Sequence, residues 1–244
     1  MTGWFDQPAH LMIVPVVLPL IAAALMLLLG EKRRRISALV NVLVCGVNLA
    51  VAIALLVWVN GGATGAGAQE PANALGIYLP GNWPVPFGIV LVADRLSVAM
   101  VLLVALVALA SVLFAVARWD RAGVHFHALF QIQLMGLNGA FLTADLFNLF
   151  VFFEVLLAAS YGLALHGSGR ARVAAGLHYV AVNLCASFLF LLAVAIIYRV
   201  TGTLGMADIA AKIPSVAPAD LPLLHAGVAL LAVAFLTKAA IWPL

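Results

Sequence analysis

Charged residues are scarce in this sequence. Asp, Glu, Lys and Arg together make up 9% of its 244 residues, whereas a soluble domain carries about 25%. Apolar residues make up 66%. A chain with so few charges has too little polar surface to cover itself, so its outer surface must face lipid. Composition alone therefore excludes an ordinary soluble domain.

Cysteines are also scarce, and known catalytic or cofactor-binding motifs are missing. The two cysteines, Cys45 and Cys185, lie within apolar runs and have no Cys or His near them at the spacing of metal ligands. We expect two small core residues rather than a disulfide or a metal site. The sequence contains no nucleotide-binding glycine loop, catalytic triad or flavin motif. It predicts a protein that performs no covalent catalysis of these kinds and uses no cofactor.

A secretory signal is missing as well, because the stretch before the first apolar run contains Asp6 but no Lys or Arg. The net charge is +3, which by itself suggests an acidic partner. However, the positive residues lie in short loops between apolar runs, as membrane topology requires. We therefore predict no nucleic-acid site.

Long apolar runs are abundant. A helix needs about 20 apolar residues to cross a bilayer. About seven runs qualify, at about 11–29, 37–59, 96–117, 124–143, 146–166, 174–199 and 223–243. The sequence thus predicts an all-α, polytopic membrane protein with about seven transmembrane helices.

The loop charges predict that the N-terminus lies outside. Lys and Arg favour cytoplasmic loops, and this orientation leaves only Arg95, Arg199 and Lys212 on the external side. The external loop 60–95 contains turn-forming Pro and Gly residues around Trp83, which predict a hairpin or an irregular cap. The cytoplasmic set comprises Lys32, Arg33, Arg34, Arg35, Arg118, Arg121, Arg170 and Arg172.

Two charged residues lie inside apolar runs, Glu154 in the fifth and Lys238 in the seventh. A charge at the bilayer centre costs about 2.5–3.5 kcal/mol on insertion scales, so something must offset it. One interpretation is a proton relay between the two residues. The others are a structural ion pair and a lysine that snorkels to the interface. Their depths in the membrane differ by about 10 Å, which leaves direct contact open.

Weaker candidates lie near the ends of the runs. Asp145 opens the fifth run, where it either caps the helix or assists ion access. His178 lies about one turn inside the sixth, where it either passes protons to Lys238 or rests among lipid headgroups. His125 and His127 are predicted to be interfacial, without the further ligands that a metal site needs.

Three segments carry a resemblance to a known family. They are GLNGAFLTADLFNLFVFFEVLLAASYGLALHGSG at 136–169, GLHYVAVNL from Gly176, and FLTKAAIWPL at the end. The first resembles the fifth-helix region of antiporter-like membrane subunits. Within that superfamily it is most similar to the D-type subunits of the Mrp/Pha-type multisubunit cation/proton antiporters.

The resemblance implies roles for individual residues. Glu154 corresponds to a glutamate that family members need for transport, and Lys238 to a lysine on a helix that breaks at a proline. His178 is a looser match to a protonatable position. Family members exchange Na⁺ or K⁺ for protons in hetero-oligomers with other membrane subunits. They reside in the lipid bilayer of the bacterial plasma (inner) membrane and have no redox cofactor of their own.

The resemblance also implies an incomplete fold. Relatives have about fourteen helices, including two inverted repeats, whereas this sequence ends within the first repeat. We expect a truncated chain in which residues 1–120 hold the first three helices with the loop 60–95. Residues 121–244 then hold helices four to seven as part of one repeat.

Two other functions stay open. The first is a proton-pumping membrane subunit of an NADH:quinone oxidoreductase or of a membrane hydrogenase complex, which would share the Glu154–Lys238 relay. The second is a scaffold subunit in which the two charges only hold helices together. The sequence does not discriminate Na⁺ from K⁺.

Overall fold

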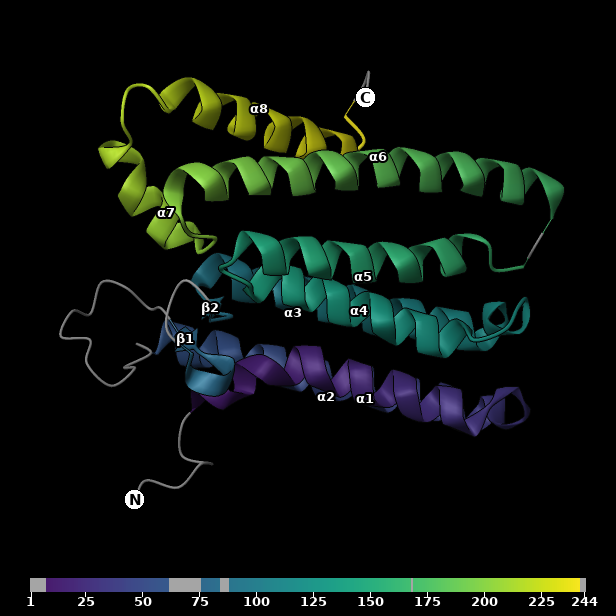
Figure 1. Ribbon diagram of the computed structural model, residues 1–244. Helices are drawn as coiled ribbons and strands as arrows, with labels where there is room; N and C mark the ends of the chain where they lie inside the picture. The colour runs from purple at the N-terminus through teal and green to yellow at the C-terminus, as the bar shows by residue number, and fades with distance from the viewer. Residues whose placement is uncertain (1–7, 62–75, 84–87, 168, 242–244) are drawn as a thin grey trace.

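The computed structural model describes residues 8–61, 76–83, 88–167 and 169–241. Long helices run beside one another in alternating directions, and the chain reverses at each end of the bundle (Figure 1). The helices are α1 Val14–Leu29, α2 Arg34–Asn60, α3 Arg95–Ala117, α4 Phe126–Leu142, α5 Leu146–Ala164, α6 Arg170–Thr201, α7 Met206–Lys212 and α8 Leu221–Lys238. Short 3₁₀ turns include η1 Pro8–Ile13, η2 Glu31–Arg33, η3 Pro80–Asn82, η4 Trp119–Arg121 and η5 Ile213–Ser215.

The helical membrane architecture is confirmed. Among the described residues, 6 helices are long and apolar enough to cross a membrane. The predicted run 124–143 coincides with α4, whose 17 residues fall short of the roughly 20 that a span needs. Three predicted boundaries were wrong: α6 extends beyond 174–199 at both ends, and α8 ends at Lys238 rather than near 243.

The predicted hairpin between α2 and α3 is present in the described part of that segment. β1 Gly76–Tyr78 pairs with β2 Leu91–Ala93 in antiparallel register, with Gly76 opposite Ala93. Leu91 also forms a bridge to Thr143, which ties the hairpin to the connection between α4 and α5. We refer to this end of the bundle, at the left of Figure 1, as the hairpin end.

The opposite end, at the right of Figure 1, carries most of the arginines. It is formed by η2, η4 and the turn between α5 and α6, and we refer to it as the arginine-rich end. The charge bias predicts that it is cytoplasmic.

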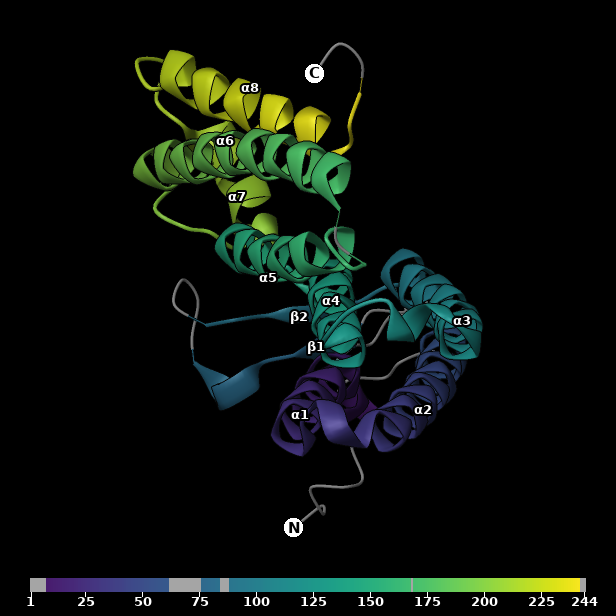
Figure 2. The ribbon, with the colours of Figure 1, turned by 90° about the vertical axis from the view of Figure 1, so that its right-hand side faces the viewer.

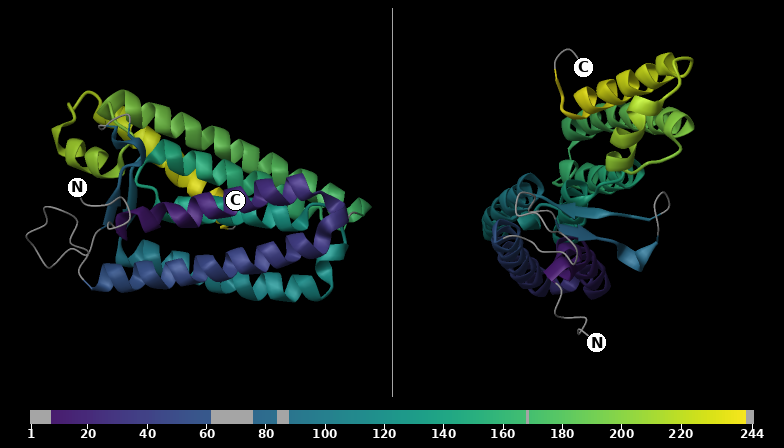
Figure 3. Two further views of the ribbon diagram at one scale, coloured as in Figure 1. Left: turned by 90° about the horizontal axis from the view of Figure 1, so that it is seen from below. Right: turned by 90° about the vertical axis from the view of Figure 1, so that its left-hand side faces the viewer.

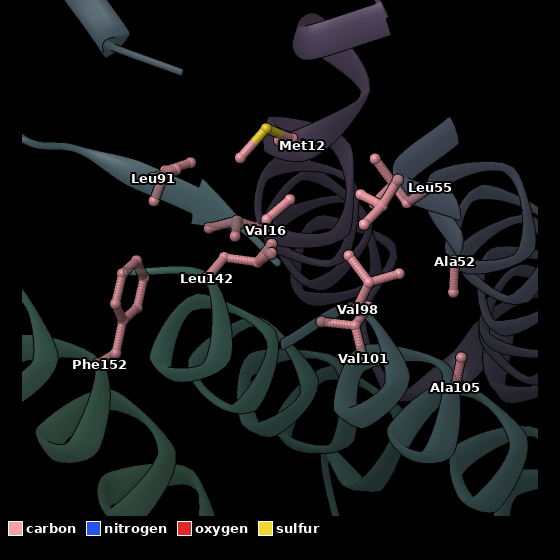
Figure 4. Close-up of a cluster of buried hydrophobic side chains, with 12 residues drawn as sticks. Met12, Val16, Ala52, Leu55, Leu91, Val98, Val101, Ala105, Leu142 and Phe152 are labelled. Carbon is pink, nitrogen blue, oxygen red and sulfur yellow. The ribbon is translucent and has the colours of Figure 1, made fainter. Parts of the chain in front are cut away.

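The apolar core has two main parts. One lies among η1, α1, α2, α3 and β2, reaches α4 and α5, and includes Met12, Leu55 and Leu91, all at most 2% exposed (Figure 4). The other joins α5, α6 and α8 around the fully buried Phe190. Cys45 is buried as predicted, whereas the prediction of a core position was wrong for Cys185, which lies on an exposed face of α6.

Helix α4 connects these two parts, since it packs against both α1 and α5 (Figure 2). Two views along the bundle show α1, α2 and α3 on one side of α4, and α5, α6 and α8 on the other (Figures 2 and 3). Glycine allows the close approach of α4 to α5. A Cβ at Gly136 would meet the backbone nitrogen of Leu156 at 2.8 Å and the carbonyl oxygen of Phe152 at 2.9 Å.

Candidate functional site

The structure brings together the two charged residues that the sequence placed inside apolar runs. Glu154 lies on α5 and Lys238 is the last residue of α8, and Lys238 Nζ lies 3.7 Å from Glu154 Oε1. The lysine side chain is 10% exposed and the glutamate side chain 32% exposed. An ion pair in this setting offsets the free energy of placing each charge in lipid.

Ser187 on α6 completes a chain between the two charges. Its hydroxyl accepts a hydrogen bond of 3.1 Å from Lys238 Nζ and donates one to Glu154 Oε1. The sequence analysis missed this residue, because single serines are common in spans and usually bond to their own helix. The signal was the i, i+4 spacing of Asn183 and Ser187, which puts two buried polar side chains on one face of α6.

The end of α8 favours a cation at position 238. Backbone hydrogen bonds beyond it come from Ala239 to the Phe235 carbonyl and from Ala240 to the Thr237 carbonyl. The last carbonyls of a helix and its dipole stabilise positive charge. The ammonium also lies 5.5 Å from the centroid of the Phe153 ring, a cation–π distance. The proline at which the resemblance predicts a helix break is Pro243, which lies outside the described residues.

A cavity of about 430 Å³ opens beside Lys238. Its walls come from α5, α6 and the end of α8, and its polar members besides Lys238 are His178, Tyr179, Asn183 and Thr237. His178 and Lys238 therefore line the same cavity. His178 is exposed, and its Nδ1–H donates 2.9 Å to the Ala174 carbonyl, which leaves Nε2 to face other partners. Its role in passing protons stays a prediction.

Asp145 belongs to a separate cluster at the hairpin end. Its carboxylate accepts 2.8 Å from the backbone N–H of Asn148, which confirms the predicted helix cap of α5. The Asn148 side chain in turn donates 3.0 Å to the Thr143 hydroxyl. A role for Asp145 in ion access stays a prediction.

The prediction that both His125 and His127 are interfacial was wrong for His127. That ring is 5% exposed and lies between Asn41 on α2 and Asp120 in η4. Position near a helix end suggested contact with headgroups, but the packing of α4 behind α1 and α2 covers the residue. His125 itself is exposed and has a left-handed backbone, with φ of 56°.

Comparisons with known proteins find similar membrane subunits of antiporters. Residues 143–244 match the family described as NADH:quinone oxidoreductase/Mrp antiporter, TM. A relative from Rhizobium meliloti, named as a probable K⁺/H⁺ antiporter subunit of the D type, is 51% identical over 244 residues, which is 100% of this chain and 44% of the relative. A D-type Na⁺/H⁺ antiporter subunit of Alkalihalophilus pseudofirmus is 39% identical over 84% of this chain and 39% of the relative.

A solved structure shows the same fold. The Mrp complex from Dietzia sp. DQ12-45-1b contains a chain with a TM-score of 0.82 and 33% identity, covering 98% of this chain and 42% of that one. The chain thus spans less than half the length of the relatives it matches. With its membrane helices and these similarities, the chain is a multi-pass protein of a bacterial inner membrane, and its residues 143–244 match the NADH:quinone oxidoreductase/Mrp antiporter family.

Proposed function

We propose that the chain is part of a membrane subunit of a secondary cation/proton antiporter, which exchanges Na⁺ or K⁺ for protons together with other membrane subunits. The observation that carries the proposal is the bridge from Lys238 through Ser187 to Glu154 beside a cavity. Intramembrane acids and bases that are linked in this way are typical of proton pathways. The names of the relatives include both K⁺ and Na⁺, so both cations belong to the proposal.

The bridge can move one proton without moving a helix. A proton leaves Lys238 Nζ for the Ser187 oxygen while the Ser187 proton passes to Glu154 Oε1. One N–H and one O–H bond break and two O–H bonds form, and each atom that loses a proton retains the electron pair of that bond. The products are a neutral amine and a neutral carboxylic acid, so both charges disappear from the membrane interior together. A cation that approaches the glutamate would favour the reverse arrangement, with Glu154 ionised.

A second candidate is a proton-pumping subunit of a quinone-reducing or hydrogenase complex. The family description, which covers both kinds of assembly, favours keeping it. Such a subunit would use the same three side chains and differ in its partners. Purification of the native complex separates the two: flavin or iron–sulfur subunits accompany a redox-driven pump and are absent from an antiporter.

The direct test is Glu154→Gln in the full-length subunit within its complex. Membrane vesicles carrying an imposed pH gradient receive Na⁺ or K⁺, and a fluorescent pH indicator reports exchange. We expect the variant to lose about 100-fold or more in rate, because the proton acceptor is gone. Co-purification of the other subunits measures assembly.

Asp208→Asn is the matched control. Asp208 is also an acid paired with a lysine, 3.2 Å from Lys212, but it lies on the short helix α7, which is not one of the helices long enough to cross a membrane. We expect unchanged exchange in this variant. Full exchange by an assembled Glu154→Gln complex would contradict the relay and support a scaffold whose charges only join helices.

A further inference from the structure

A second acid–base pair lies outside the candidate site, at the arginine-rich end. His127 Nε2 and Asp120 Oδ2 are 3.4 Å apart, and the two side chains are 5% and 6% exposed. Helix α4 supplies the histidine and η4 the aspartate. Buried ionisable groups are rare unless they are paired, and neither residue takes part in the relay described above.

A chain of side-chain hydrogen bonds leads from the pair into the bundle, and each donor in this chain points toward the pair. Asn41 Nδ2 lies 2.9 Å from His127 Nδ1 and can only donate, so Nδ1 accepts and the ring proton is on Nε2, facing Asp120. Gln131 Nε2 donates 2.6 Å to Asn41 Oδ1. Both amides are fully buried. The chain ends at Gln131 Oε1, which has no hydrogen-bond partner among the described residues.

The outer end of the chain meets a small polar cavity. Its volume is about 20 Å³, enough for one water, and its walls include Arg34, Ser37, His125 and both members of the pair. Asp120 Oδ1 is buried and lacks a hydrogen-bond partner in the described part of the chain. A wider cavity of about 550 Å³ adjoins Asp120 and is lined by Arg34, Arg35 and Arg121. Protons from the solution at this end can therefore reach the carboxylate.

From these contacts we propose that Asp120 and His127 form a second proton-binding site, whose occupancy is transmitted into the membrane by the orientations of Asn41 and Gln131. The charged and titratable groups that face the pair or its amides are Arg34, Arg35 and Cys45 from α2, His125 before α4 and Arg121 from η4. The neighbouring residues of α1 and its end, Met26 and Gly30, do not titrate.

Protonation of the pair reverses the chain. When the pair is held as imidazolium and carboxylate, the added proton is on His127 Nδ1, because Nε2 already carries the hydrogen that faces Asp120. This proton faces the hydrogens of Asn41 Nδ2, so the Asn41 amide must turn and accept with Oδ1. Asn41 Nδ2 then points at Gln131, which must turn as well and accept with Oε1. The inner end of the chain changes from an acceptor to a donor. One proton at the arginine-rich end thereby changes the hydrogen-bonding character of a position inside the membrane.

Helix packing connects that change to the relay. Gln131 precedes Gly136 by five residues on α4, and Gly136 is the point where α4 lies against the backbone of α5 at Phe152 and Leu156. Glu154 lies between these two residues. A shift of α4 that accompanies the amide reversal therefore acts on the helix that carries the glutamate. We infer that the proton site sets the exchange rate according to pH at the arginine-rich end.

The test is His127→Gln in the full-length subunit and its complex. Glutamine retains a donor toward Asp120 but does not titrate. With pH varied between about 5 and 8 on the arginine-rich side, the wild-type exchange rate should show a one-proton step that the variant lacks. Its rate at the optimum should stay within about twofold. An identical pH profile in both proteins would overturn the proposal. His125→Gln, which replaces the exposed neighbour, should retain the step.

A binding measurement keeps this site separate from the relay. In purified Glu154→Gln complex, infrared difference spectra between two pH values should still contain histidine and amide bands. Both kinds of band should vanish when His127→Gln is added. The amide bands alone should vanish when Asn41→Ala is added instead. Their presence supports the proton site even if the relay proposal fails, and their absence from assembled complex contradicts it. Asp120→Asn should also remove the histidine band, because the carboxylate that stabilises imidazolium is lost.

Discussion

The two acid–base pairs differ in where the space beside them lies. Lys238, which pairs with Glu154, lines a cavity of about 430 Å³ between α5, α6 and α8. Asp120 and His127 adjoin a cavity of about 20 Å³, and Asp120 also adjoins the outer cavity of about 550 Å³, but the inner side of this pair is filled by amides. Space between the long helices lets water and ions reach a pair, whereas a pair that amides close on its inner side can take up a proton without passing an ion inward. The same chemistry thus suits transport in one place and sensing in the other.

The comparison also locates what connects the pairs. Helix α4 carries His127 and Gln131, while α5 carries Glu154, and the two helices are in extensive contact. The Asp120–His127 pair is held by Asn41 of α2. Glu154 is held by residues of α6 and α8. Substitutions at the α4–α5 contact should therefore separate sensing from transport, and substitutions within one pair should leave the other intact.

The largest effect on stability is expected from Gly136→Ala. The new methyl group would lie within 3 Å of backbone atoms of α5, which cannot move as a side chain end can. We expect destabilisation of about 2 kcal/mol from overpacking, together with loss of the pH step described for His127. Thermal unfolding of the complex in detergent measures the first, and vesicle exchange the second.

The matched control is Gly46→Ala on α2, where a Cβ would meet nothing within 4 Å. Alanine is favoured over glycine inside a helix by about 1 kcal/mol, so this variant should be as stable as wild type or more so. A Gly136→Ala complex that is fully stable and retains its pH step would show that the two pairs communicate by another route, or not at all.

The sequence predicted the ion pair better than its surroundings. Glu154 and Lys238 could be identified from the sequence because a charge inside an apolar run is costly in lipid whatever the arrangement of the helices. Ser187 could not be identified in this way, because its role depends on which face of α6 packs against α5 and α8. The packing of the helices decides which face that is. The same holds for His127, whose burial depends on helices that are distant in the sequence.

Helix identities were also easier to predict than helix ends. Apolar length revealed each long helix, since the bilayer thickness sets that length. The end of α8 at Lys238 and the extension of α6 to Arg170 depend on local backbone hydrogen bonds that hydropathy does not describe. The cap at Asp145 was predictable because capping is a local interaction over a few residues.

A smaller effect is expected from Ser187→Ala. The direct approach of Lys238 to Glu154 at 3.7 Å remains, but the hydroxyl that links them is lost. Hydrogen bonds to charged groups contribute about 1.5–3 kcal/mol, so exchange should fall about tenfold and should recover in Ser187→Thr. Ser111→Ala, at an exposed serine of α3, is the control. Wild-type rates in Ser187→Ala would mean that the proton passes directly between the two charges.

The smallest effect is expected from Asp145, and it decides between the two roles that the sequence left open. Asp145→Ala removes the cap of α5 and should lower stability by about 1 kcal/mol, seen as a lower unfolding temperature in detergent. Asp145→Asn retains an oxygen that can accept from the Asn148 N–H but has no charge. If the residue only caps the helix, Asp145→Asn should exchange cations at the wild-type rate. A decrease confined to low cation concentrations would instead indicate that the carboxylate, although only 8% exposed, attracts the ion at the hairpin end, because the electric field of a charge acts on the encounter rate.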